Sequence, residues 1–178
     1  MLAATAMAAD SPVDKGSLIL GGSASFTSMG GNLYKEGGKS SSLILLAPSV
    51  GYFVSPGVEL GAKIGFSSLS VGGSSLNTLS LGPEIGYYFP SGSNVEIKGS
   101  LYPYIKAFFL YSSQKADGWS KSITGTTFGG QGGINYMLSK AVALDAFASL
   151  QSDSKSAGDV SVSGTILMLG VGITAFTY

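Results

Sequence analysis

Apolar side chains alternate with small or polar ones along most of this chain, and that period of two limits the structures it can form. Across residues 58–66, Val, Leu, Ala, Ile and Phe occupy every second position, and Glu, Gly, Lys and Gly lie between them. Successive side chains of a strand point to opposite faces, whereas a helical face repeats every 3.6 residues. The pattern therefore predicts a β-strand with one apolar face.

The alternation recurs often enough to predict eight strands. They cover residues 18–26, 43–53, 58–66, 79–89, 95–111, 128–136, 142–151 and 160–178. The last segment is uncharged and resembles a membrane-spanning helix in length, but its Gly, Ser and β-branched residues favour a strand. Because this segment is apolar on both faces, the pattern does not fix which of its side chains point inward.

The composition separates this chain from ordinary soluble sheet proteins. Only 11% of its residues are charged, about half the share in an average soluble domain. Yet 44% are hydrophobic, and the mean hydropathy is +0.34. Glycine (27 residues) and serine (30 residues) replace the missing charge on the polar faces, where a soluble sandwich would carry many Lys and Glu. We infer a barrel whose apolar face meets lipid and whose interior holds small and polar side chains.

The residue types that are absent limit the chemistry. The chain has no His and no Cys, which removes Ser-His-Asp and Cys-His catalysis, imidazole and thiolate metal ligands, and disulfides. We therefore predict no enzymatic activity, no metal and no cofactor. Ten Lys+Arg balance ten Asp+Glu, so the basic surface that a nucleic-acid-binding protein needs is not expected.

The polar faces of the predicted strands carry a set of charged side chains, which we term the lumen charge network. Its members are Glu59, Lys63, Glu84, Glu96, Lys98, Lys106 and Asp145. An eight-stranded barrel is just wide enough inside for its side chains to fill, and buried charges need partners. We expect salt bridges and hydrogen bonds in place of an apolar core. The alternative is that the same charges gate a narrow polar or ion path.

The predicted connections differ in length on the two sides of the barrel. Residues 54–57, 90–94 and 139–141 are short, whereas residues 29–42, 69–77, 113–124 and 152–159 are longer and polar. Short turns on one side and long loops on the other are expected of a bacterial outer-membrane barrel, with the short side in the periplasm.

Aromatic residues gather at the strand ends beside the short connections and predict a periplasmic aromatic girdle. Its members are Tyr52, Tyr87, Phe89, Tyr136, Phe176 and Tyr178. At the opposite strand ends, a second girdle is predicted from Phe26, Phe66, Phe109, Tyr111 and Phe128. Aromatic rings favour both interfaces of a membrane, and a soluble sandwich has no reason to place them so.

One strand end also repeats as a motif, because Pro-Ser-Val-Gly-Tyr-Phe at 48–53 returns as Pro-Glu-Ile-Gly-Tyr-Tyr-Phe at 83–89. With the alternation and the aromatic last residue, residues 16–178 resemble the small outer-membrane β-barrel proteins of Gram-negative bacteria, including OmpX-like and OmpA-transmembrane-like barrels. The resemblance implies an all-β, eight-stranded antiparallel up-and-down transmembrane β-barrel in contact with lipid and lipopolysaccharide. It implies that the barrel-assembly machinery recognises the last strand through Phe176 and Tyr178. Enzymes among such barrels use histidine, which this chain lacks.

The remaining expectations concern domains and function. Residues 1–9 are small and apolar with an Ala-x-Ala pattern, so we interpret them as a signal-peptide remnant or a disordered tail, and residues 10–178 as one barrel domain. The expected function is a structural or surface-interaction role, with loops 29–42 and 113–124 contacting lipopolysaccharide, an envelope protein or a host surface. A narrow, low-conductance channel is the alternative. A soluble lipocalin-like ligand-binding barrel would need the apolar face inside.

Overall fold

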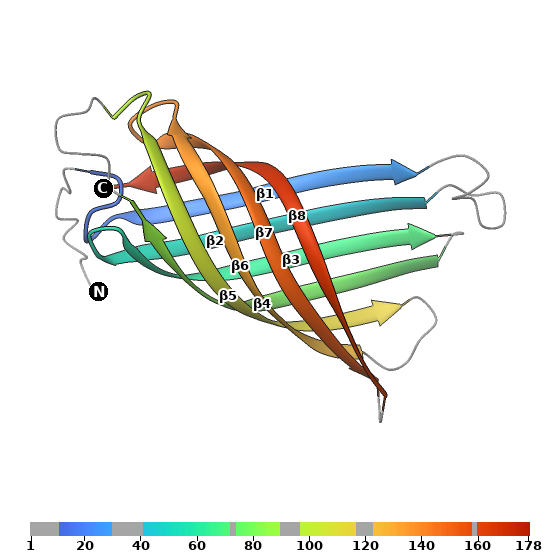
Figure 1. Cartoon of the computed structure of the whole chain (residues 1–178). Helices are drawn as coiled ribbons and strands as arrows, with labels where there is room; N and C mark the ends of the chain where they lie inside the picture. Colours follow the sequence, from blue (N-terminus) through green and yellow to red (C-terminus); the bar gives the residue numbers. More distant parts are fainter. Residues whose placement is uncertain (1–10, 30–40, 72–73, 90–96, 117–122, 158–159) are drawn as a thin grey trace, which may run out of the picture.

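The computed structural model describes residues 11–29, 41–71, 74–89, 97–116, 123–157 and 160–178, and in this part of the chain a closed antiparallel barrel is formed (Figure 1). Each strand pairs with the next one in sequence, and β1 pairs with β8. The strands are β1 (Leu18–Met29), β2 (Ser41–Ser55), β3 (Val58–Val71), β4 (Ser74–Tyr88), β5 (Leu101–Ala116), β6 (Ile123–Met137), β7 (Val142–Ala157) and β8 (Val160–Thr177). The predicted up-and-down eight-stranded barrel is confirmed. Among the described residues, no helix has the length and apolar character to cross a membrane.

Alternation along each strand separates an apolar outer face from a mixed inner one. On β4 and β5, Leu81, Ile85 and Ile105 are 52–58% exposed, while their neighbour Glu84 is 5% exposed. The same division holds on the other strands, whose outward Leu, Ile, Val and aromatic side chains remain exposed. The apolar face therefore points away from the barrel axis, as the composition predicts for a barrel in lipid.

The structure fixes the orientation of β8, which the sequence pattern left open. Leu167, Leu169, Val171 and Ile173 are 63–77% exposed, whereas Thr174 and Phe176 are buried. The even-numbered residues at this end of β8 therefore face the lumen. Apolar residues on both faces had hidden this phase.

The connections do not follow the predicted difference in length. β3 continues to Val71 and β7 to Ala157, so residues 72–73 and 158–159 alone join them to the next strands, and the predicted longer connections 69–77 and 152–159 are wrong. On the other side, residues 89–100 separate β4 from β5. The predicted strand start at residue 95 is wrong, because residues 97–100 form a turn with Gly99 at φ 85°. Residues 30–40 and 117–122, within the two loops expected to contact partners, lie outside the described residues.

The segment at residues 11–17 packs under the barrel end at which β1 begins and β8 ends, which we call the termini end. Val13 is fully buried, and its carbonyl accepts a hydrogen bond from the Gly57 N–H at 2.8 Å. The Gly16 N–H donates to the Phe53 carbonyl at 2.9 Å, and the Phe53 N–H donates to the Ser17 carbonyl at 3.0 Å. These bonds hold residues 11–17, which we call the cap segment, against the termini end of the barrel, a feature that the alternation did not predict.

Gly57 in the β2–β3 turn gives a first testable prediction. Its φ of 77° lies in the left-handed region, and a Cβ there would stand 2.5 Å from the Tyr88 carbonyl oxygen. We expect Gly57→Ala to lower the free energy of unfolding by about 1–3 kcal/mol. Urea titration of the protein folded in lipid vesicles measures this change. Gly164→Ala is the matched control because nothing lies within 4 Å of a Cβ at that position, and equal effects of both substitutions would contradict the prediction.

Candidate functional site in the barrel lumen

A three-residue ion cluster crosses the lumen near the termini end. The Lys106 Nζ of β5 lies 2.9 Å from the Glu59 Oε2 of β3 and 3.1 Å from the Glu84 Oε1 of β4. All three side chains are at most 7% exposed. Because one cation serves two carboxylates out of water, the cluster depends on Lys106 for charge compensation.

Glycines on neighbouring strands make room for this cluster. Gly86 on β4 pairs with Glu59 on one side and with Lys106 on the other, so the three residues form one row across the wall. A Cβ at residue 86 would stand 2.8 Å from the Glu59 Oε2 and 3.1 Å from the Lys106 Cγ. Because Gly86 has no side chain, the side chains of Glu59 and Lys106 can meet above it.

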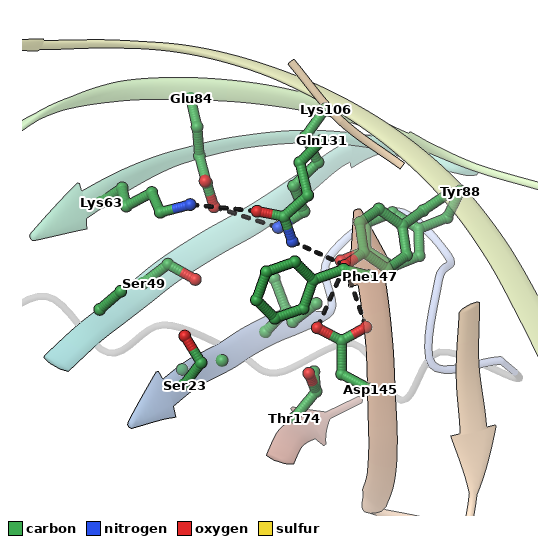
Figure 2. A pocket seen from close by; sticks show the side chains of 15 residues that line it. Ser23, Ser49, Lys63, Glu84, Tyr88, Lys106, Gln131, Asp145, Phe147 and Thr174 are labelled. Atoms are coloured by element: carbon green, nitrogen blue, oxygen red, sulfur yellow. Dashed lines mark hydrogen bonds and ion pairs between the residues drawn. The ribbon is translucent and has the colours of Figure 1, made fainter. Parts of the chain in front are cut away.

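A second set of polar side chains forms a hydrogen-bonded chain through the lumen (Figure 2). The Lys63 Nζ donates to the Gln131 Oε1 at 3.1 Å, and the Gln131 Nε2 donates to the Tyr104 hydroxyl at 2.7 Å. That hydroxyl donates in turn to the Asp145 carboxylate at 2.9 and 3.1 Å. The chain links β3, β6, β5 and β7, so it fastens opposite walls of the barrel to one another.

Toward the termini end, the lumen is filled by five inward aromatic residues, which we call the aromatic plug: Phe53, Tyr88, Tyr102, Tyr104 and Phe176. Each is at most 4% exposed. Tyr88 stacks on Tyr104 with ring centroids 5.0 Å apart and meets the edge of Phe53 at 5.3 Å. The Lys106 Nζ lies 5.5 Å from the Tyr88 ring, within cation–π range. Val13 packs into the same cluster from the cap segment.

Two cavities of different size occupy the rest of the lumen. One of about 30 Å³ lies among Lys63, Glu84 and Lys106, with room for about two water molecules. The other, of about 620 Å³, lies on the far side of Lys63 and Gln131, which line both spaces. Among the described residues, no group of three or more Asp or Glu side chains is placed to hold a metal ion.

Comparison with known proteins identifies the fold family. The family model for the outer membrane protein β-barrel domain matches residues 1–174. The chain belongs to this family. A search of curated protein sequences found no significant match.

Solved outer-membrane barrels share the fold at low sequence identity. Neisserial surface protein A is 18% identical, with a TM-score of 0.54, over 89% of this chain and 94% of that one. OprG from Pseudomonas aeruginosa is 14% identical, with a TM-score of 0.57, over 95% and 99%. The N-terminal barrel domain of Pseudomonas aeruginosa OprF is 15% identical, with a TM-score of 0.50, over 92% and 98%. The protein is an outer-membrane barrel, and its exposed apolar face accordingly meets the lipid of that membrane.

In this outer-membrane barrel, five members of the predicted lumen charge network lie inside. Glu59, Glu84 and Lys106 form the ion cluster, and Lys63 and Asp145 end the hydrogen-bonded chain. The placement of Lys98 in the lumen is wrong: this side chain is exposed in the turn before β5. The predicted strand 95–111 wrongly included this turn, so its alternation assigned Lys98 to the inner face. Glu96 lies outside the described residues.

The predicted periplasmic girdle divides into outward and inward members. Tyr52, Tyr87, Phe89 and Tyr136 are 40–47% exposed on the outer face. Phe176 is instead 1% exposed and belongs to the aromatic plug, so its predicted position in the lipid-facing girdle is wrong. Tyr178 is half-buried against the same cluster, and its hydroxyl donates to the Lys140 carbonyl at 2.9 Å.

At the other end of the barrel, the outer face carries the second predicted group of aromatic residues. Phe66, Phe109, Tyr111 and Phe128 are exposed there. The side chain of Phe26 lies outside the described part of the structure.

The inward tyrosines are the functional residues that the sequence interpretation did not single out. Tyr88, Tyr102 and Tyr104 occupy polar-face positions of β4 and β5. The signal was present in the alternation, since each of them lies two or four residues from a charged residue of the lumen and therefore on the same face of its strand. The alternation places these three tyrosines on the polar face, but the prediction gave a role only to aromatic residues at the membrane interfaces.

Proposed function

We propose that this barrel does not conduct across the outer membrane and acts as a structural or surface-interaction protein at the end opposite the termini end, which we call the loop end. Its partners there would be lipopolysaccharide, an envelope protein or a host surface, and the barrel-assembly machinery would act on β8 during insertion. The observation that carries the proposal is that the ion cluster and the aromatic plug fill the lumen near the termini end.

The ion cluster and the aromatic plug also argue against the alternative of a narrow channel. A water path would have to pass the Lys106 contacts and then the stacked rings of Tyr88 and Tyr104. Separating Lys106 from its carboxylates would leave buried charge uncompensated, which costs about 3–5 kcal/mol. Displacing the rings would open a further void in a packed cluster. Both costs favour a permanently closed lumen.

Planar-bilayer recording tests this proposal. We expect the refolded wild-type protein to give no reproducible conductance steps, even at high protein load. The triple variant Phe53→Ala/Tyr88→Ala/Lys106→Ala, which removes two rings of the plug and the lysine of the ion cluster, should produce steps because it removes both closures. The matched outward pair Tyr52→Ala/Tyr87→Ala should remain silent. Wild-type steps that change size when Glu84 is neutralised would instead support the channel.

A further inference from the structure

The barrel closes over a short pairing of β1 with β8. β1 and β8 form five residue pairs, between residues 18–22 and 173–177, whereas β7 and β8 form sixteen. Beyond these five pairs, residues 23–29 of β1 and 160–172 of β8 are unpaired with each other in the described structure. Figure 1 shows β8 diverging from β1 over this stretch. We call this gap the seam.

The 620 Å³ cavity lies against the seam. Its lining includes the lumen-facing side chains of Leu45 and Met168. It also includes Leu46 on β2 and Leu169 and Val171 on β8, all of which face outward. Ser23 and Ala24 of β1 line it as well, so residues on both sides of the unpaired stretch border the cavity. Since the outer face lies in the membrane, the cavity borders the membrane along this unpaired stretch.

The cavity has one apolar wall and one polar wall. On the seam side, the lumen-facing residues include Leu43 and Leu45 of β2 and Ile166 and Met168 of β8, with Ser23 of β1 between them. The opposite wall, on β3 to β7, is mostly polar. Its hydroxyl and amide side chains include Ser67, Thr78, Ser112, Thr127 and Gln151, and the apolar Leu110 and Phe147 lie among them. An apolar inner face on β8 has no use in a polar lumen, but it suits an apolar chain. This accounts for a strand that is apolar on both faces.

Cationic groups outnumber anionic ones around this cavity. The Lys63 Nζ at its floor bonds the Gln131 amide oxygen and lies 4.4 Å from the Phe108 ring centroid. Lys155 of β7, nearer the loop end of the cavity, donates to the Gln114 amide oxygen at 3.1 Å. Neither lysine has a carboxylate within 4.0 Å among the described residues. Of the lining residues, Asp153 alone is anionic, and it accepts a hydrogen bond from Thr127.

We propose that this cavity binds a single-chain anionic amphiphile, a long-chain carboxylate, which enters from the membrane through the seam. The alkyl chain lies along the apolar wall of β2 and β8, and the carboxylate pairs with Lys63. The volume falls within the range of about 300–1,000 Å³ of ordinary ligand sites. Unpaired strand edges are costly in hydrocarbon. The next residues in the same register are Ser23 and Gly172, beyond the last observed pair of Gly22 with Ile173, so further pairs could form behind a bound chain.

Photo-crosslinking of the full chain in lipid nanodiscs tests the site. The probe is palmitate that carries a diazirine on its alkyl chain, and mass spectrometry identifies the labelled residues. We expect labelling of Leu45 and Met168 that excess unlabelled palmitate removes, together with weaker labelling of outward residues that it does not remove. Labelling confined to outward residues would overturn the proposal.

Matched variants separate the cavity from the bilayer. Met168→Trp places a bulky ring in the cavity and should reduce the competable labelling at Leu45 about tenfold. Leu167→Trp, one residue away on the outer face, should not change it. Equal labelling in both variants would refute a lumen site. Heat-dependent gel mobility verifies that each variant is folded.

The role of Lys63 has its own test. Lys63→Met should weaken competition by palmitate about tenfold, as expected when a charged hydrogen bond is lost. It should leave competition by palmitate methyl ester unchanged, and Lys140→Met in an exposed turn should change neither. Loss of competition by both ligands, or by neither, would contradict the carboxylate assignment. The inference goes beyond the proposed function: crosslinking reports the site, and conductance reports the closed lumen independently.

Discussion

Replacing Lys106 by Met is expected to lower the free energy of unfolding by about 3–5 kcal/mol, because it leaves Glu59 and Glu84 in the lumen without their shared cation. The Glu59 side chain is 1% exposed and that of Glu84 is 2% exposed, so solvent offers little compensation. The methionine keeps most of the side-chain volume against the plug, which directs the effect to charge. Urea titration of the protein folded in vesicles measures the change.

Two further variants separate charge from packing in this test. Lys140→Met removes an exposed lysine and should change stability by no more than about 0.5 kcal/mol. Adding Glu59→Gln and Glu84→Gln to Lys106→Met removes the uncompensated charge and should recover most of the lost stability. A triple variant as unstable as Lys106→Met would show that the cluster acts through shape. A fully stable Lys106→Met variant would show that the ion pairs contribute nothing.

The ion cluster could be anticipated because its strands carry charge. On β3, β4 and β5, Glu59, Lys63, Glu84 and Lys106 mark the polar face, and alternation then fixes the direction of every neighbouring side chain. Which charges meet depends on strand register, which a single sequence does not specify. Glu59 and Lys106 meet because both pair with Gly86. The membership of the network was therefore accessible from sequence, and its pairing was not.

Elsewhere, the sequence pattern gave incomplete or wrong predictions. In these places the alternation did not show which face of a strand points inward, or the strand ended without a clear sequence signal. β8 has no charge to mark its inner face, and aromatic residues at its end fitted an interface as well as a plug. The predicted strand included residues 97–100, which instead form a turn in which Gly99 has a positive φ. The loop-end extensions of β3 and β7 are rich in serine, which resembles loop composition although these residues pair in register. Tertiary pairing decided each case.

The second large effect is expected for Phe176→Ala, which removes a fully enclosed ring from the aromatic plug. We expect the free energy of unfolding to fall by about 3–5 kcal/mol, the usual cost of truncating a buried Phe. The neighbouring cap segment limits collapse into the void, because Val13 is itself fixed by the hydrogen bond from Gly57. Unfolding of purified, refolded protein measures this without involving cellular assembly, in which the C-terminal strand has a separate expected role.

Phe128→Ala is the control, since the same side chain is lost from an outward position where 65% of it is exposed. Lipid fills the space left by an outward ring, so no lasting cavity forms and the change should stay below about 1 kcal/mol. Equal losses for Phe176→Ala and Phe128→Ala would mean that Phe176 anchors the barrel at the membrane surface, as the girdle prediction held. A large difference would establish that the even-numbered face of β8 is the inner one. That phase also directs Ile166 and Met168 into the seam-side cavity, so the same measurement bears on the wall proposed to hold an alkyl chain.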